Sequence, residues 1–208
     1  YMAGETESRD LDAKPVGGKP LTSAVFKGYL TKYAPEGQEV VWRVLIGGSS
    51  NTVPHAVVLD RDGNVYVAGT TGARDLPLLH PVQDTQTGLN ICFLMKFSPD
   101  GELLFSTYFG GERNDEGLAL AVDSTGNIYL AGRASSTQLP VKNALQPHIS
   151  GGGQDAFIAK FTPDGAHVEE LRVALQRDAQ IGRPLVLLRR HHPRARHRER
   201  EAHHRGVG

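Results

Sequence analysis

The stretch FLMKFSPDGELLFSTYFGGERNDEGLALAVDSTGNIYLAG, residues 93–132, decides the fold because most of it occurs a second time in the chain. Residues 119–140, which begin in its second half, match residues 56–77 at nine of 22 positions with an offset of 63. Ordinary residue usage would give about one identity. The opening FLMKFSPDG returns as FIAKFTPDG at residues 157–165, with an offset of 64. A repeat of this length therefore organises the chain.

Each repeat contains four short runs typical of β-strands, separated by turn residues. LALAVD (118–123) passes through Ser-Thr-Gly-Asn into NIYLAG (127–132), and a long link then leads to AFIAKF (156–161). In the other copy, CFLMKF (92–97) passes through Ser-Pro-Asp-Gly into ELLFSTYF. Pro second and Gly fourth in that tetrapeptide favour a type I turn. The pattern predicts a four-stranded antiparallel meander in each repeat.

Four strands in about 63 residues describe a propeller blade better than a solenoid rung. The side chains indicate an order within the blade. LALAVD has Ala and Val but no aromatic residue and suits the crowded axis, whereas VVWRVLI and LLFSTYF carry the aromatic rings and suit the wide outer edge. We predict LALAVD innermost, then NIYLAG, then AFIAKF, with the aromatic strand outermost.

GNVYVAGTT, the KFSPDG turn, and LLFSTYFGGERNDEG followed by AVDSTGNIYLAG resemble the SBBP beta-propeller repeat of bacterial surface and secreted proteins. The resemblance covers about residues 26–165, and the strand order is also similar to that of NHL-type propellers. It implies an extracellular or cell-envelope repeat array without assigned catalysis.

The predicted fold class is all-β, a partial beta-propeller of four-stranded antiparallel blades with irregular N- and C-terminal tails. We expect an irregular lead-in at residues 1–25 and propeller repeats at 26–165. The repeats divide into an outer half-blade (26–48), a blade (55–111) and a blade from 118 to 165 onward. Closed propellers use four to eight blades. We therefore expect a fragment of a longer array, or an array completed by another chain.

Residues 166–208 differ in kind from the rest. They hold 10 Lys and Arg against 5 Asp and Glu, whereas residues 1–165 hold 13 against 18. A shift of reading frame would explain the change, and a genuine basic tail is the alternative. The tail has no aromatic residues for base stacking, so no specific nucleic-acid binding is expected. No apolar run approaches the roughly 18 residues that span a bilayer.

The strand order places the long loops of the blades on one face, which we predict to be the recognition face for a protein or a glycan. This long-loop face carries the predicted ligand-binding residues Asn51, Arg74, Asp75, Asn114, Asp115 and Glu116, together with His80 and His148. Ordinary solvated loop residues are the alternative interpretation. Asp115 and Glu116 could serve in acid-base chemistry only if one of them is buried.

Other chemical motifs are weak. Asp60-Arg61-Asp62-Gly63-Asn64 is similar to the start of a calcium loop, but it has no closing Glu, so a turn that caps its own backbone is the better interpretation. The single cysteine, Cys92, lies in an apolar run and is expected to be buried and inert. No metal site, cofactor or catalytic residue is predicted.

The favoured function is a non-enzymatic scaffold or recognition module. The alternative is a propeller enzyme, a lyase or hydrolase with an axial active site, for which only His55 stands at the start of an inner strand. A third interpretation is a truncated product with no function of its own.

Overall fold

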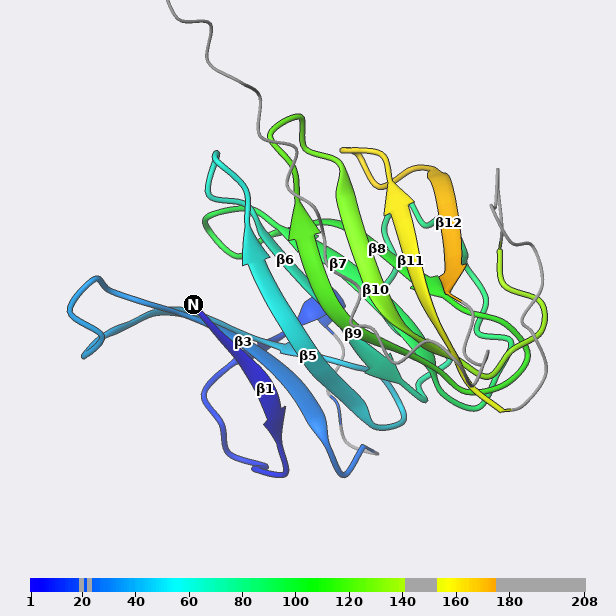
Figure 1. Ribbon diagram of the computed structural model, residues 1–208. Helices are drawn as coiled ribbons and strands as arrows, with labels where there is room; N and C mark the ends of the chain where they lie inside the picture. The colour runs from blue at the N-terminus through cyan, green and yellow to red at the C-terminus, as the bar shows by residue number, and fades with distance from the viewer. Residues whose placement is uncertain (19–20, 22–23, 141–152, 175–208) are drawn as a thin grey trace, which may run out of the picture. The chain divides into compact units, whose positions relative to one another are not determined.

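The computed structural model describes residues 1–18, 21, 24–140 and 153–174. In this part of the chain the strands form three four-stranded sheets, and there is no α-helix (Figure 1). Sheet 1 consists, in spatial order, of β1 (Met2–Thr6), β3 (Lys27–Tyr33), β4 (Val40–Ile46) and β2 (Lys14–Pro15). Sheet 2 consists of β5 (Thr52–Leu59), β6 (Val65–Thr71), β7 (Ile91–Phe97) and β8 (Leu103–Phe109). Sheet 3 consists of β9 (Asp115–Val122), β10 (Ile128–Ala134), β11 (Asp155–Phe161) and β12 (Val168–Ala174).

Sheets 2 and 3 are the antiparallel meanders that the repeat predicts, with their strands in the predicted order. The all-β, partial propeller fold is therefore confirmed. The innermost strands begin three residues earlier than expected, at Thr52 and Asp115 instead of 55 and 118. Gly63 and Gly126 occupy positive φ in the first hairpins, a conformation that glycine adopts without strain.

The expectation of an irregular lead-in at residues 1–25 was wrong. β1 lies next to β3, in the position that β6 occupies in sheet 2. Ala3 of β1 pairs with Leu30 as Ala68 of β6 pairs with Leu94. Tyr1-Met2-Ala3-Gly4 thus repeats the Tyr-x-Ala-Gly of β6 and β10. The segment has too few apolar residues to form a strand by itself, but an adjacent strand satisfies its backbone.

β2 also lies within this supposed lead-in, and it is short and parallel to β4. In sheet 2 the corresponding link forms a bridge from Leu79 to Ser106 of β8. Residues 1–25 therefore hold the second strand and the long link of a first repeat, and sheet 1 has no strand at the innermost position among the described residues.

Two apolar clusters hold the sheets together. Leu30 and Ile46 of sheet 1 pack with Phe93, Phe97 and Tyr108 of sheet 2. The other face of sheet 2 packs on sheet 3, where the Phe109 ring lies 5.6 Å from Phe157 and 5.4 Å from Phe161 between ring centroids. Alternating side chains along each strand therefore face opposite neighbours.

The aromatic residue in the middle of β4, and likewise of β8, contacts the next sheet. A Cβ added to Gly101 would lie 2.9 Å from the Trp42 ring, and one added to Gly165 would lie 2.6 Å from the Phe105 ring. Trp42 Nε1 also donates to the Pro99 carbonyl at 2.9 Å. The Pro-Asp-Gly turns of sheets 2 and 3 thus contact the outer strand of the preceding sheet.

The third repeat, predicted to run from residue 118 to 165 onward, includes β12 as a strand of its sheet. β12 pairs with β11 in the outermost position, so residues 168–174 belong to the sheet and not to the basic tail. Residues 175–208, whose origin was the open question, lie outside the described residues. Among the described residues, no helix has the length and apolar character needed to cross a membrane.

Candidate functional site

The long-loop end of the sheets is built around Asp115, which is fully buried. Its carboxylate accepts hydrogen bonds from Gly111 N at 2.7 Å, from Ser135 N and Ser136 N at 3.1 Å each, and from Ser136 Oγ at 2.6 Å. These donors come from the β8–β9 loop and from the segment after β10. Asp115 therefore joins two loops, and its oxygens are occupied by the protein itself.

The two asparagines predicted for this face also take part in the framework. The Asn51 side-chain oxygen accepts from Phe26 N at 3.1 Å, and the Asn114 side-chain oxygen accepts from Asn90 Nδ2 at 3.4 Å. Both bonds run from the start of one sheet's inner strand to the start of the third strand in the preceding sheet. They connect neighbouring sheets.

A second pair of loop contacts, which we call the loop clasps, occurs at matching positions. In sheet 2, Asp75 accepts from Ser49 N at 2.7 Å and from Ser49 Oγ at 2.8 Å. In sheet 3, Glu112 accepts from Thr137 N at 2.9 Å and Oγ1 at 2.8 Å, and from Gln138 N at 3.2 Å. The hydrogen bond from the Thr137 amide is the main cause that lowers the pKa of Glu112 to about 2.

The two remaining predicted residues, Glu116 and Arg74, differ in their contacts. Glu116 forms a two-pronged ion pair with Arg133, with N–O distances of 2.9 and 2.8 Å, across β9 and β10. Arg74 is exposed and has no hydrogen bond or ion pair to the described residues. Of the six predicted residues, Arg74 is thus the one without a polar contact to the part of the chain that the structure describes.

At the opposite end, the Asp60 and Asp123 carboxylates close their own hairpins. Asp60 accepts from Asp62 N, from Asn64 N and Nδ2, and from the Tyr66 hydroxyl, at 2.8 to 3.0 Å. Asp123 repeats this arrangement with Asn127 and Tyr129. These oxygens cap a turn, as the alternative to the calcium interpretation predicted, and the described residues include no group of metal-binding side chains.

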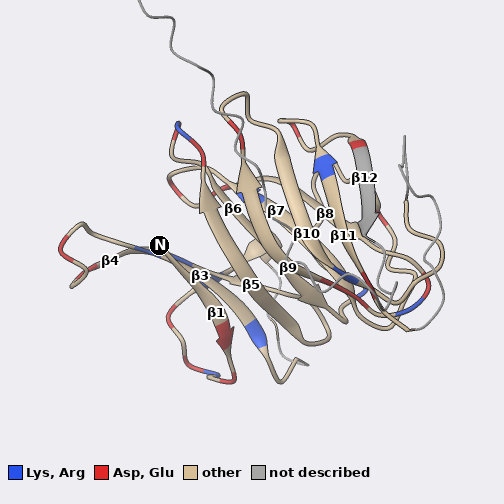
Figure 2. Cartoon of the chain, viewed as in Figure 1, with Lys and Arg blue, Asp and Glu red and all other residues tan. Residues whose placement is uncertain are grey.

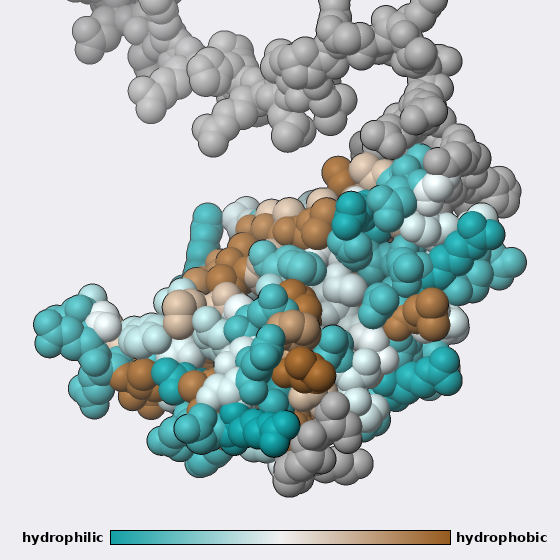
Figure 3. All heavy atoms as spheres, turned by 90° about the horizontal axis from the view of Figure 1, so that it is seen from below, coloured by the Kyte–Doolittle hydropathy of each residue, from teal (hydrophilic) through white to brown (hydrophobic). Residues whose placement is uncertain are grey.

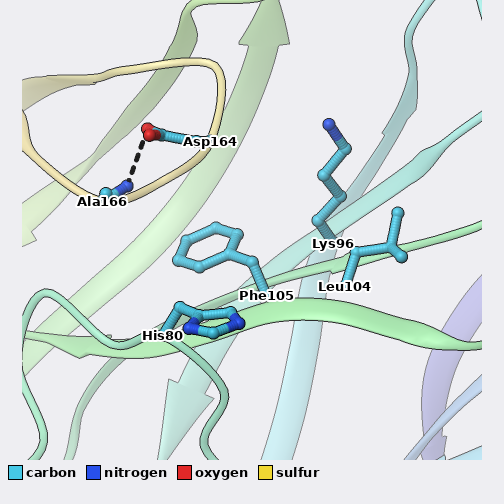
Figure 4. A pocket seen from close by; sticks show the side chains of 6 residues that line it. All are labelled: His80, Lys96, Leu104, Phe105, Asp164 and Ala166. Carbon is cyan, nitrogen blue, oxygen red and sulfur yellow. Dashed lines mark hydrogen bonds between the residues drawn. The ribbon is translucent and has the colours of Figure 1, made fainter.

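A groove of about 410 Å³ lies where the outer part of sheet 2 meets the turn of sheet 3. It is lined by His80, Lys96, Leu104, Phe105, Asp164 and Ala166. Figure 4 shows the His80 and Phe105 rings beside one another, Asp164 on the turn across from them, and Lys96 and Leu104 on the other side of Phe105. The groove combines an apolar floor with groups of both charges.

The groups around this groove are held in place. Asp164 accepts from Ala166 N at 3.0 Å, and a hydrogen bond from Thr162 is the main cause that lowers its pKa. Lys96 Nζ lies 5.0 Å from the centroid of the Tyr66 ring and 3.9 Å from the Asp60 carboxylate. Lys96 also borders a second hollow of about 310 Å³ between the Asp60 and Asp123 hairpins.

His80 was expected on the long-loop face, but the structure places it in this groove with residues of the Pro-Asp-Gly turn. The link that follows β6 runs along the outer strand toward the turn end, as the bridge from Leu79 to Ser106 shows. The groove was missed in the sequence because its lining comes from two repeats. His148 lies outside the described residues.

The other residues considered from the sequence have clear positions. Cys92 is buried, as predicted, and burial raises the pKa of its thiol. His55 lies exposed at the bulge of β5. Figure 2 shows many of the charged residues in the loops and turns, whereas most of each strand in sheet 2, and most of β9, β10 and β11, is uncharged.

Three sheets of successive repeats, packed face to face through matching contacts, define a beta-propeller repeat protein. Residues 41–77 and 104–140 match the SBBP beta-propeller repeat, so the chain contains two segments of this repeat. Each matched segment runs from the outer strand of one sheet to the second strand of the next. The family repeat therefore includes the loop that joins neighbouring blades.

A similar protein is the regulatory protein FlaEY of Caulobacter vibrioides, which is 28% identical over 158 residues. The alignment covers 75% of this chain and 15% of FlaEY. The chain thus spans a small part of the length of this relative.

Proposed function

We propose that the chain is a non-enzymatic recognition module of an extracellular or cell-envelope protein, and that it binds a protein or a glycan in the groove formed by His80, Lys96, Leu104 and Asp164. The observation that carries this proposal is the groove itself. Its volume of about 410 Å³ is in the range of small-ligand sites. It offers exposed apolar surface at Leu104, which is 40% exposed, beside a cation and a carboxylate.

The polar residues at the loop end already form hydrogen bonds within the protein, which supports the groove as the binding site. Asn51, Asp75, Asn114 and Asp115 have hydrogen bonds that join loops or neighbouring sheets. A ligand that took these groups would break contacts within the propeller. The groove requires no such exchange. Binding on the long-loop face remains a prediction, with Arg74 as its best-placed residue.

The non-enzymatic part of the proposal rests on carboxylates that have the same role in sheets 2 and 3. Asp60 and Asp123 occupy matching positions in sheets 2 and 3, and each accepts hydrogen bonds from its own turn. Catalysis needs a group that is distinguished from its repeats by its environment. These carboxylates have the same framework role in both repeats.

Binding to arrays of defined bacterial oligosaccharides and of synthetic peptides tests the proposal. We expect Leu104→Glu and His80→Ala to weaken the binding of a probe about tenfold or more, because they change the floor of the groove. Arg74→Ala is the control on the opposite face and should leave binding unchanged. Loss of binding in the Arg74 variant alone would move the site to the long-loop face.

The extracellular or envelope location is part of the proposal and rests on the resemblance to surface and secreted SBBP proteins. Accessibility to protease on intact cells that express the protein tests it directly. Degradation only after the cells are lysed would contradict this location.

A further inference from the structure

The Pro-Asp-Gly turns of sheets 2 and 3, residues 99–101 and 163–165, lie in matching places. Each turn's glycine lies against an aromatic ring of the preceding outer strand. This ring is Trp42 at the junction of sheets 1 and 2, which we call the first junction, and Phe105 at the junction of sheets 2 and 3, the second junction. In both turns the glycine N–H donates to the carbonyl of the residue before the proline, at 3.0 and 2.9 Å. The two turns are therefore placed alike against the preceding sheet.

At the first junction, side chains of sheet 1 occupy the Pro99 carbonyl. This oxygen accepts hydrogen bonds from Lys32 Nζ at 2.8 Å and from Trp42 Nε1 at 2.9 Å. Lys32 and Trp42 are paired across β3 and β4, so one sheet presents both donors together. An ammonium group and an indole N–H thus meet the first turn at a single acceptor.

At the second junction, the matching carbonyl of Pro163 lacks these donors. Phe105 takes the place of Trp42 and has no N–H group. Lys96 takes the place of Lys32, but its ammonium group lies 3.9 Å from a carboxylate in a hairpin of its own sheet. Pro163 is exposed, and no hydrogen bond from the described part of the chain reaches its carbonyl. An acceptor that is occupied at the first junction is therefore open at the second.

The groove of about 410 Å³ lies at this second junction, between Phe105 and the turn. The Asp164 carboxylate lies on the turn across from the His80 and Phe105 rings (Figure 4). Asp164 directly follows Pro163, so a carboxylate and an open carbonyl belong to the same turn. The groove therefore has acceptor oxygens on one side and aromatic rings on the other.

Carboxylates outnumber cations around this groove and the adjoining hollow between the Asp60 and Asp123 hairpins. Lys96 borders both spaces, so they form one surface. The charged residues that line this surface are four carboxylates and two cations, namely Asp60, Asp62, Asp123, Asp164, Arg61 and Lys96. A surface with an excess of carboxylates attracts cationic ligands and repels anionic ones. The local charge therefore favours a cationic ligand.

The acidic groups at the long-loop end are less available to a basic ligand. Figure 3 shows this end, seen from below the view of Figure 1, with apolar patches between hydrophilic residues. The carboxylates of Asp115 and Glu112 accept hydrogen bonds from loop N–H and hydroxyl groups, and Glu116 pairs with Arg133. A basic ligand would have to break these contacts, whereas it would find an open carbonyl at the second junction.

We propose that the groove binds an arginine side chain of a protein partner, with the guanidinium donating to the Pro163 carbonyl and the Asp164 carboxylate. This inference rests on the groove being the binding site proposed above, and it names the class of ligand. A guanidinium is planar, has five N–H donors and stacks on aromatic faces. It can therefore meet the turn while it lies against the His80 ring. It takes the place that Lys32 and Trp42 hold at the first junction.

Fluorescence anisotropy with short labelled peptides tests the requirement for a guanidinium. The probe is a peptide with one arginine between leucines, and its matched counterpart contains citrulline, which has a similar shape without the charge. We expect the arginine peptide to bind about tenfold more tightly, because charged donors form stronger hydrogen bonds. Added salt should weaken the binding of the arginine peptide more than that of the citrulline peptide. Equal affinities of the two peptides would overturn this inference and leave the groove as a binding site.

Two variants test the position of the guanidinium. Asp164→Asn removes the carboxylate charge and should weaken binding of the arginine peptide about fivefold. Phe105→Trp introduces the indole donor of the first junction and should weaken binding about tenfold, because the indole competes for the turn carbonyl. Asp100→Asn is the matched control, since it alters the same position in a turn whose carbonyl is already occupied. Circular dichroism melting verifies that each variant folds. Unchanged affinity in either groove variant would overturn the inference.

The oligosaccharide array separates failure of this inference from failure of the proposed function. An oligosaccharide that binds, and whose binding Leu104→Glu weakens, would overturn the inference if neither peptide binds, and it would keep the groove as the recognition site. If neither peptide binds and no oligosaccharide binds, both the inference and the proposed function are wrong.

Discussion

The loop ends of sheets 2 and 3 hold the same backbone geometry with different chemistry. Where sheet 3 begins with a buried carboxylate, Asp115, sheet 2 begins with Thr52, whose hydroxyl lies 2.8 Å from that of Thr71. The loop clasps differ in the same way, because the acceptor is Asp75 after β6 in sheet 2 but Glu112 before β9 in sheet 3. The two repeats keep the same loop contacts but form them with different residues. We therefore attribute these contacts to the fold and not to the binding of a ligand.

The largest difference is expected between Asp115→Ala and Thr52→Val. Loss of the Asp115 carboxylate leaves several buried donors unsatisfied and should lower the free energy of unfolding by about 3 kcal/mol. The Thr52 change removes one hydroxyl contact and should cost about 1 kcal/mol. Urea denaturation measures both. Equal losses would show that the carboxylate does not hold the loops together.

Substitution of the glycine in the Tyr-x-Ala-Gly motif should have different costs in sheets 3 and 1. A Cβ on Gly132 would lie 1.9 Å from the Glu116 carbonyl oxygen of the inner strand, whereas a Cβ on Gly4 would meet the movable Tyr29 hydroxyl at 3.0 Å. We expect Gly132→Ala to cost about 2 to 3 kcal/mol, because backbone must shift, and Gly4→Ala to cost less than about 1.

Thermal unfolding monitored by circular dichroism measures this difference. If Gly4→Ala were as damaging as Gly132→Ala, an inner strand would have to lie beside β1 as well. The pair therefore also tests whether sheet 1 has an open innermost position.

Two substitutions can build the loop clasp of sheet 3 into sheet 2. Ser49→Glu alone places a carboxylate against Asp75 and should destabilise the protein by about 1 kcal/mol. Addition of Asp75→Gln recreates the arrangement of sheet 3 and should recover most of that loss. A double-mutant cycle in urea measures the coupling. An additive result would mean that the two positions do not interact.

These contrasts also explain what could be predicted from the sequence. The strand order of sheets 2 and 3 was predictable because turns such as Asp60 to Asn64 are specified by nearby residues. β1 was missed because its evidence is the four-residue match of Tyr1 to Gly4 with Tyr66 to Gly69, which has meaning only once the pairing with β3 is known.

The candidate site depended on contacts that a linear reading does not supply. Asp115 was found as a loop carboxylate, but its burial results from Ser135 and Ser136, which follow the next strand. The groove needs His80 from one repeat and Asp164 from another. Neither the order of the residues nor their hydropathy brings these two together. The tertiary packing of sheet 3 on sheet 2 does so.

The smallest expected effect is the acid sensitivity of the sheet 3 clasp. Because the folded-state pKa of Glu112 is lowered to about 2, its contribution to stability is present above the ordinary glutamate pKa of about 4.3 and is lost as the pH falls toward 2. Glu112→Gln cannot lose a charge in this range. Compared with the unaltered protein, it should be slightly less stable at pH 6, with the difference shrinking steadily between pH 4.5 and pH 2. Urea midpoints of both proteins across this range measure the effect, and Asp100→Asn, at an exposed turn residue, is the control. A difference that stayed constant with pH would mean that the Glu112 charge adds nothing to its hydrogen bonds with Thr137 and Gln138.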